Sequence, residues 1–313
     1  MPVTAVLPDA PWLEEVFLTR LPQPDIRAVI RQSPADFRVT ETLSNKPVGS
    51  GEHVYLDVTK TGANTAWVAD RIAEFAGVRP LDVGYAGRKD RHAMTRQWFS
   101  VYLPKSEPAW SSLTIEGVDL HQAVRHATKL RRGEIECNRF DITVRHEHLE
   151  PRQVQDVEHR LVSIRDSGFP NYFGPQRFGR YLHNLESADK LLRFKRKARG
   201  DRGMLLSAAR AWLFNLYLSR QVGTADEHET GPLYGKSRDA QAGEEALSDV
   251  YAGWVAGLRR LGSKVGERKL MTMPRNMQWT QADEHLQIAF DLPAGSYATS
   301  LLSEVFVVED GAL

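Results

Sequence analysis

The chain has 313 residues and a mass of 35.3 kDa, which allows one large domain or two of ordinary size. Hydrophobic residues make up 42% of the chain and charged residues 26%, a composition that excludes intrinsic disorder. The 41 Lys and Arg residues nearly cancel the 40 Asp and Glu residues, so only local clusters of charge can indicate a polyanionic partner. The single cysteine, Cys137, excludes a disulfide framework within the chain and argues against a Cys-based zinc site.

The N-terminus and the most apolar stretch both bear on localisation. The first 20 residues lack the basic start of a secretion signal, and Glu14 and Glu15 interrupt their apolar residues. Residues 204–218 are too few to span a membrane, and they include Arg210. We therefore expect a cytoplasmic protein that does not associate with membranes.

Strands are predicted where polar and apolar residues alternate. The first two such runs are residues 36–41 and 53–59, and Val54, Leu56 and Val58 share one face of the second. Three further strands are predicted at residues 98–103, 138–144 and 286–292.

Helices are predicted where apolar residues recur at helical spacing. Asn64 is a good helix cap, Val68, Ile72 and Phe75 follow at that spacing, and Gly77 ends the helix. Further helices are predicted around residues 154–164, 207–222 and 250–261, with a loop at 223–244.

The order of these elements predicts an α+β fold. Strands lie toward both ends of the chain, whereas residues 170–275 are mostly helical in pattern. We therefore expect a discontinuous sheet domain, residues 1–169 and 276–313, interrupted by a mainly helical domain at 170–275.

Several common catalytic motifs do not occur in the sequence. It has no G-x-x-x-x-G-K-[ST] loop, no G-x-G-x-x-G, no H-E-x-x-H and no G-x-S-x-G. His146, His148 and Glu150 alternate and could face one way as metal ligands, although a solvated strand end is the more ordinary interpretation. Chemistry that needs a bound nucleotide or zinc therefore has no support in the sequence.

One polar segment places a single carboxylate among cations. Arg88, Lys89, Arg91 and Arg96 surround Asp90 and favour its ionised form. Such a carboxylate could act as a nucleophile or a general base, and the cations could hold phosphates. The alternative is a surface turn with exposed ion pairs, which composition alone favours.

Two basic runs strengthen the functional interpretation. Residues 190–202 contain seven cations and 125–132 contain four, which indicates an RNA or DNA ligand in a chain of such small net charge. Phe140, Tyr172 and Phe173 could stack on exposed bases, although each could equally belong to the core.

The segment from Gly84 to Gln97 resembles the signature of the TruD family of tRNA pseudouridine synthases. Further stretches resemble blocks of that family in the expected order: residues 33–39, 51–60, 64–65, 69–70, 168–179 and 292–299. The resemblance implies a pseudouridine-synthase-like catalytic domain, a mixed sheet with a cleft, into which a family-specific, mainly helical domain is inserted. It also implies conversion of uridine 13 of tRNA to pseudouridine without a cofactor.

The resemblance assigns roles to individual residues. Asp90 matches the catalytic aspartate, which could attack C1′ of the ribose or remove a proton from C2′. Arg31 lies where the family usually has a lysine that pairs with the aspartate, so the charge is kept and the geometry changes. Phe140 matches the aromatic that stacks on the target base, and Asn138 in the same block is expected to contact the ligand.

The target uridine lies inside a folded RNA and has to be flipped into the cleft. Candidates for RNA binding are Arg88, Lys89, Arg91, His92, Arg96, Gln97, Asn171, Tyr172, Gln176, Arg177, Lys195, Arg196 and Lys197. We expect tRNA as the partner, no obligate protein partner and a monomer, since no coiled-coil heptads occur.

Two other functions remain open at this point. The first is a non-catalytic RNA-binding module, which would have no reason to keep a carboxylate facing a polyanion. The second is another enzyme that cleaves glycosidic bonds, which would usually need a second carboxylate as an acid. Asp82 is the one nearby acid that suggests itself.

Overall fold

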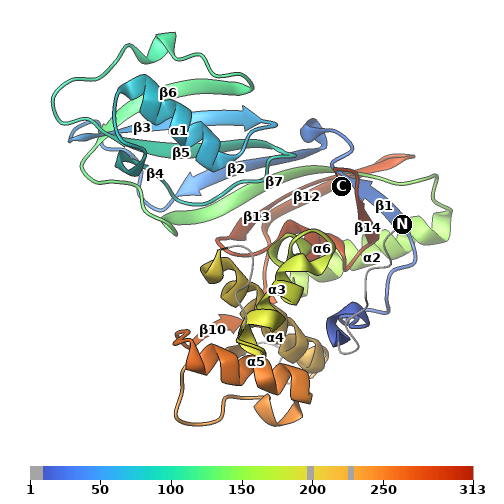
Figure 1. The fold of residues 1–313 in the computed structure, drawn as a ribbon. Helices are drawn as coiled ribbons and strands as arrows, with labels where there is room; N and C mark the ends of the chain where they lie inside the picture. Colours follow the sequence, from blue (N-terminus) through green and yellow to red (C-terminus); the bar gives the residue numbers. More distant parts are fainter. Residues whose placement is uncertain (1–9, 196–200, 225–228, 313) are drawn as a thin grey trace, which may run out of the picture. The chain divides into compact units, whose positions relative to one another are not determined.

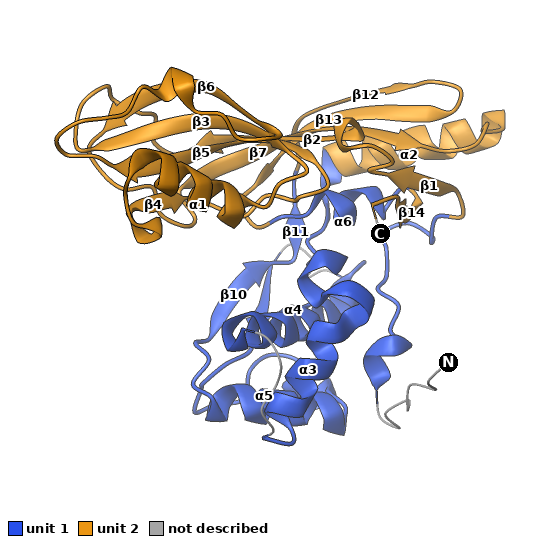
Figure 2. Ribbon diagram, turned by 45° about the horizontal axis from the view of Figure 1, so that its top comes forward, with its two compact units in different colours: residues 1–24, 166–273, 296–305 blue, residues 25–165, 274–295, 306–313 orange. Residues whose placement is uncertain are grey.

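A computed structural model describes residues 10–195, 201–224 and 229–312 (Figure 1). These residues belong to two compact units, which Figure 2 colours separately. We call them the sheet unit, residues 25–165, 274–295 and 306–313, and the helical unit, residues 1–24, 166–273 and 296–305. Each unit is described by itself.

The sheet unit is built on one mixed sheet. Among the described residues this sheet has ten strands, and its central path runs in the order β12-β13-β7-β2-β5-β3-β6. Strand β1 pairs with β7 and β14, and β4 pairs with β5. The bounds are β1 Arg27–Ile30, β2 Phe37–Leu43, β3 His53–Thr61, β4 Val83–Tyr85, β5 Met94–Tyr102, β6 Val118–His126, β7 Ile135–Arg145, β12 Arg275–Gln281, β13 His285–Pro293 and β14 Val307–Asp310.

The strand directions confirm the predicted α+β class. Strands β2 and β5 are parallel in the middle of the sheet, as are β1 and β14, while the other pairs are antiparallel. The final strand therefore returns from the end of the chain to pair with the first. This long-range pairing brings the C-terminal residues beside the start of the sheet.

Helix α1, Thr65–Ala76, packs on the sheet through its apolar face. Val68 and Ile72 are fully buried against Val54, Leu56 and Val58 of β3. Gly77 ends the helix in a left-handed conformation with φ of 65°, as the sequence predicts. Asn64 occupies the expected N-cap position, but its side chain makes no capping hydrogen bond. Helix α2, Pro151–Ser167, follows β7.

The helical unit has its own apolar core. Its helices are α3 His183–Leu192, α4 Arg202–Gln221, α5 Asp249–Arg260 and α6 Ala298–Leu302. The long helix α4 begins at Asp201, whose side chain accepts a hydrogen bond from the Gly203 amide, and it buries Trp212 and Leu213 beside Trp254 of α5. Two short antiparallel strand pairs, each between segments far apart in the sequence, complete the unit: β8 Phe169–Pro170 with β11 Met271–Thr272, and β9 Thr230–Leu233 with β10 Gly266–Lys269.

The compact units change at 165/166 and 273/274, close to the division predicted at 169/170 and 275/276, and two further segments group with the helical unit. The N-terminal segment belongs with the helical unit because Trp12 is buried in its core and Phe17 stacks on Tyr172 at 5.3 Å between ring centroids. Residues 296–305 also belong there, since the hydroxyl of Ser300 donates to the Tyr172 carbonyl at 2.9 Å. Neither contact has a local signature in the sequence.

None of the described helices is both long enough and apolar enough to cross a lipid bilayer.

Candidate active site

Asp90 lies in the loop between β4 and β5, and its carboxylate is held at both oxygens. Oδ1 accepts a hydrogen bond from the His92 backbone N–H at 3.0 Å, and Oδ2 lies 3.4 Å from Nη1 of Arg31. The side chain nevertheless keeps 27% of its surface exposed. The carboxylate is therefore oriented by the protein and open to a ligand.

Lys60, at the end of β3, supports the backbone of this loop from within. Its Nζ donates to the carbonyl oxygens of Ala63 and Asp90, each at 2.8 Å. The residue is completely buried, and this burial lowers its pKa to about 8, against an opposing attraction from Asp90. A buried ammonium thus fixes the main chain at Asp90.

A second set of hydrogen bonds ties the same loop to α1 and β5. The Lys89 backbone N–H donates to Oγ1 of Thr65 at 2.9 Å, and that hydroxyl donates to Oε1 of Gln97 at 2.9 Å. The Gln97 amide in turn donates to the Gly87 carbonyl at 3.3 Å. Gln97 is fully buried, so in this structure it shapes the loop from beneath.

Arg31 bridges two carboxylates with one nitrogen. Its Nη1 lies 2.5 Å from Oδ2 of Asp310, on the C-terminal strand, as well as 3.4 Å from Asp90. The guanidinium also lies over the ring of Phe37, 4.4 Å from its centroid. Arg31 has a left-handed backbone with φ of 57°, an uncommon conformation for a non-glycine residue, and strain of this kind is found at functional sites.

A buried ion pair lies beneath the Asp90 loop. Nζ of Lys89 lies 2.8 Å from Oε2 of Glu41 and donates to Oδ1 of Asn138 at 2.5 Å. The Lys89 side chain is 7% exposed and that of Glu41 is completely buried. Glu41 and Asn138 face each other across β2 and β7, so the pairing of these strands assembles the cluster.

Phe140 lies two residues beyond Asn138 on the same face of β7. It is 8% exposed, stacks on Phe290 at 5.5 Å between centroids and meets Phe37 edge-on at 6.1 Å. Because Phe37 also contacts Arg31, Phe140 is linked to Asp90 through two intervening side chains. Its small exposed area is what remains for a ligand.

The other candidates near Asp90 are the exposed residues of the loop and Arg96, which is exposed as well as ion-paired. Arg88, Arg91 and His92 are exposed. Arg96 is engaged in a two-pronged ion pair with the buried carboxylate of Asp57, with Nη2 2.6 Å from Oδ2.

Four candidates lie in the helical unit. Asn171 is buried, where its amide donates to the Lys269 carbonyl and its Oδ1 accepts from Arg268. Tyr172 is buried too, and its hydroxyl donates to the Leu18 carbonyl at 2.9 Å. Arg177 is half-buried, with its guanidinium 5.6 Å from the centroid of the Phe173 ring. The fourth candidate is Gln176, which is exposed.

The basic run of the helical unit is only partly described. Lys195, which follows α3, is exposed. The other two candidates of this run, Arg196 and Lys197, lie outside the described residues.

Sequence reasoning did not single out Lys60, Glu41, Thr65 or Asp310. Two of them carry a signal: Lys60 continues the buried stripe of β3, and Glu41 occupies an inward position of β2. A charged residue on an otherwise apolar face indicates a buried polar contact. Asp310 has no such signal, because only the pairing of β14 with β1 brings it to Arg31.

No group of three or more His, Cys, Asp or Glu side chains suited to a metal ion occurs among the described residues. Of the residues considered as ligands, His146 contacts the Glu147 carbonyl through Nδ1 at 2.7 Å. His148 pairs with Asp283 at 2.6 Å, and this hydrogen bond raises its pKa.

Known proteins resemble the chain over most of its length. The model of the family described as tRNA pseudouridine synthase D (TruD) matches residues 15–192. A protein from Cellvibrio japonicus named tRNA pseudouridine synthase D is 43% identical over 301 residues, which cover 89% of each chain. One of the same name from Nitrosococcus oceani is 41% identical over 325 residues, covering 89% of this chain and 90% of the other.

A solved structure shares the fold. The crystal structure described as a tRNA pseudouridine synthase D (TruD) from Methanosarcina mazei superposes with a TM-score of 0.66 and covers 95% of this chain and 97% of its own. At 15% sequence identity, that likeness bears on the fold alone.

Proposed function

Since the chain belongs to the tRNA pseudouridine synthase D family, we propose that it converts uridine 13 of tRNA to pseudouridine with Asp90 as the catalytic carboxylate. Conversion of uridine to pseudouridine in tRNA follows from the family. The position in the tRNA and the role of Asp90 are the proposal.

One observation carries the role of Asp90: it is an oriented carboxylate that remains partly exposed within a buried network of charges. Its 27% exposure leaves room for a ribose, while His92 and Arg31 fix its two oxygens. A carboxylate held in this way is suited to attack C1′ or to remove a proton from C2′, as the N1–C1′ bond of the uridine breaks. The base then turns and its C5 bonds to C1′, as Asp90 leaves C1′ or returns the proton to C2′. C5 then loses its proton and N1 gains one, which completes the isomerisation.

Three cations position Asp90 and take no direct part in the reaction: Arg31, Lys60 and Lys89. Arg31 attracts both Asp90 and Asp310 and reduces the repulsion between them, because one nitrogen lies near both carboxylates. Lys60 holds the Asp90 backbone, and Lys89 holds Glu41 and Asn138 below the loop. The cations therefore fix the geometry of the carboxylate before the substrate arrives.

We assign binding of the target base to Phe140 and Asn138. Phe140 offers its small exposed area for stacking. Asn138 accepts a hydrogen bond from Lys89 through Oδ1, so its amide nitrogen remains available to donate to a uracil carbonyl. The exposed cations Arg88 and Arg91 belong to the Asp90 loop and are suited to phosphate groups.

Mapping pseudouridine in unmodified tRNA after incubation with the protein tests the position. Pseudouridine at position 13 alone, and none in a tRNA that carries cytidine there, supports the assignment. Pseudouridine at another position would overturn the assignment of uridine 13 and leave the family reaction intact.

A further inference from the structure

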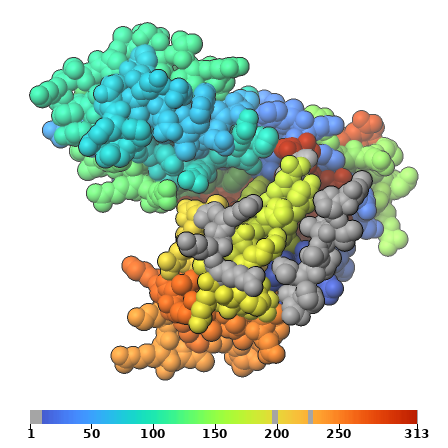
Figure 3. Space-filling model, viewed as in Figure 1, coloured from blue at the N-terminus to red at the C-terminus, as the bar shows by residue number. Residues whose placement is uncertain are grey.

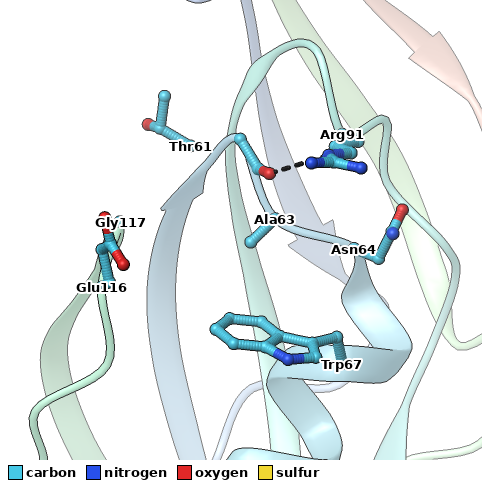
Figure 4. A pocket seen from close by; sticks show the side chains of 8 residues that line it. Thr61, Ala63, Asn64, Trp67, Arg91, Glu116 and Gly117 are labelled. Carbon is cyan, nitrogen blue, oxygen red and sulfur yellow. Dashed lines mark hydrogen bonds between the residues drawn. The ribbon is translucent and has the colours of Figure 1, made fainter.

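A concave pocket of about 500 Å³ opens beside the Asp90 loop in the sheet unit. Figure 4 shows its side chains around Ala63: Trp67 from α1, Arg91 from the loop, and Glu116 from the turn before β6. Its volume lies within the range of about 300–1,000 Å³ typical of small-ligand sites. Residues of α1 reach the molecular surface in the space-filling view of Figure 3.

Trp67 is the main apolar surface of this pocket. It is 43% exposed, whereas Val68 and Ile72 of the same helix carry the packing on the sheet. The indole is therefore not required by the apolar core. An exposed tryptophan at a concave site offers a flat face on which a nucleobase can stack.

The polar groups around the indole are available to a ligand. Nε of Arg91 donates to the Gly62 carbonyl at 3.0 Å, the contact drawn in Figure 4. Among the described residues, its Nη groups, the Asn64 side-chain amide and the indole N–H have no hydrogen-bond partner. Glu116 adds one acceptor on the other side of the pocket.

The pocket is joined to the candidate catalytic residue by the chain itself. Arg91 is the residue after Asp90, and Ala63 of the pocket wall shares the Lys60 ammonium with the Asp90 carbonyl, each at 2.8 Å. A molecule in the pocket and a ribose at Asp90 would therefore be close neighbours. The simplest occupant is a nucleotide of the same RNA.

We propose that this pocket binds an unpaired nucleobase of the substrate RNA close to the target uridine, stacked on Trp67 with its backbone phosphate beside Arg91. The proposal rests on Asp90 being the site of reaction. Flipping a uridine out of a folded RNA leaves a neighbouring base unstacked. A stacking platform beside the catalytic loop offsets that loss, and the amide of Asn64 and the carboxylate of Glu116 can contact the base edge.

Binding of unmodified tRNA to Trp67→Ala tests the proposal. Stacking on an aromatic side chain contributes enough that its loss should weaken binding by about 5- to 150-fold, while Trp67→Phe should keep most of the affinity. Tyr102→Ala is the matched control, since Tyr102 is an exposed aromatic (39%) at the other end of β5 and should bind as wild type does. Thermal unfolding of each variant shows whether the fold is kept.

A scan of abasic sites identifies the base. One abasic position near the target uridine should weaken binding to wild type and leave binding to Trp67→Ala unchanged, because the contact is already lost. Wild-type affinity in Trp67→Ala would overturn the proposal. So would a scan in which no abasic position weakens binding to wild type more than binding to Trp67→Ala. The occupant would then be a partner's aromatic side chain or a small molecule. These binding results are independent of catalysis, so absence of pseudouridine formation would count against the proposed function alone.

Discussion

Nζ of Lys60 lies 2.8 Å from the backbone carbonyl oxygen of Asp90 and 2.8 Å from that of Ala63. One buried ammonium therefore joins the catalytic loop to the wall of the neighbouring pocket. The charge that makes these hydrogen bonds strong is also costly to bury, so the contact has a measurable pH dependence.

The stability conferred by Lys60 should change with pH between about 8 and 10.5. Burial lowers its pKa from 10.5 to about 8, so over this range the unfolded chain binds a proton that the folded protein has released. Wild type should gain stability relative to Lys60→Met as the pH rises through this window, and the difference should be constant below it. Urea unfolding of both proteins at several pH values measures this, and a difference that stays flat would contradict it.

Lys89→Met should destabilise the protein by about 3–5 kcal/mol, because it leaves the buried carboxylate of Glu41 without its cation. The double variant with Glu41→Gln should recover much of that loss, since the uncompensated carboxylate is then gone. Arg71→Met is the control: its ion pair with Glu74 is exposed at both ends, and its loss should cost less than about 1 kcal/mol. Similar losses in Lys89→Met and Arg71→Met would contradict the buried-pair account.

Arg31→Lys should keep activity within about tenfold, since a single nitrogen bridges Asp90 and Asp310 and an ammonium can replace it. Arg31→Met should lower kcat by on the order of 100-fold, because two like charges are then left together and the carboxylate moves. Single-turnover rates with saturating protein measure both. Equal rates for Lys and Met at this position would show that the bridging charge has no role.

Replacing Lys195, Arg196 and Lys197 together with Ala should weaken tRNA binding and lower its salt dependence by about one unit of slope per lost phosphate contact. The modified uridine should stay the same. A variant that loses the scattered exposed cations Lys46, Lys105 and Arg152 controls for the change in net charge. An unchanged slope in the first variant would rule out phosphate contacts by this run.

Local sequence patterns predicted the helices and strands whose own residues show a clear apolar periodicity. Helix α1 is one example, with Asn64 before it and Gly77 after it, and the alternating strand β3 is another. Strand β6 was not predicted, because it lies at the sheet edge with both faces largely exposed and carries little apolar alternation. Its place depends on pairing with β3.

The site was only partly predictable for a similar reason. Asp90 and its neighbours form one continuous segment, so their clustering follows directly from the order of residues along the chain. Glu41, Lys60 and Asp310 reach the site from three separate strands, and only the pairing of those strands brings them together. Nothing in the local pattern indicates that Lys89 turns inward while its basic neighbours stay exposed.

The most direct measurement compares wild type with Asp90→Asn on unmodified tRNA, scoring pseudouridine formation and tRNA binding together. Asp82→Asn is the control, since its carboxylate pairs with Arg79 outside this network. We predict that Asp90→Asn binds tRNA within a few-fold of wild type and forms pseudouridine at least about 100-fold more slowly, while Asp82→Asn matches wild type. Pseudouridine formation by Asp90→Asn at the wild-type rate would contradict the assignment of Asp90 as the catalytic carboxylate.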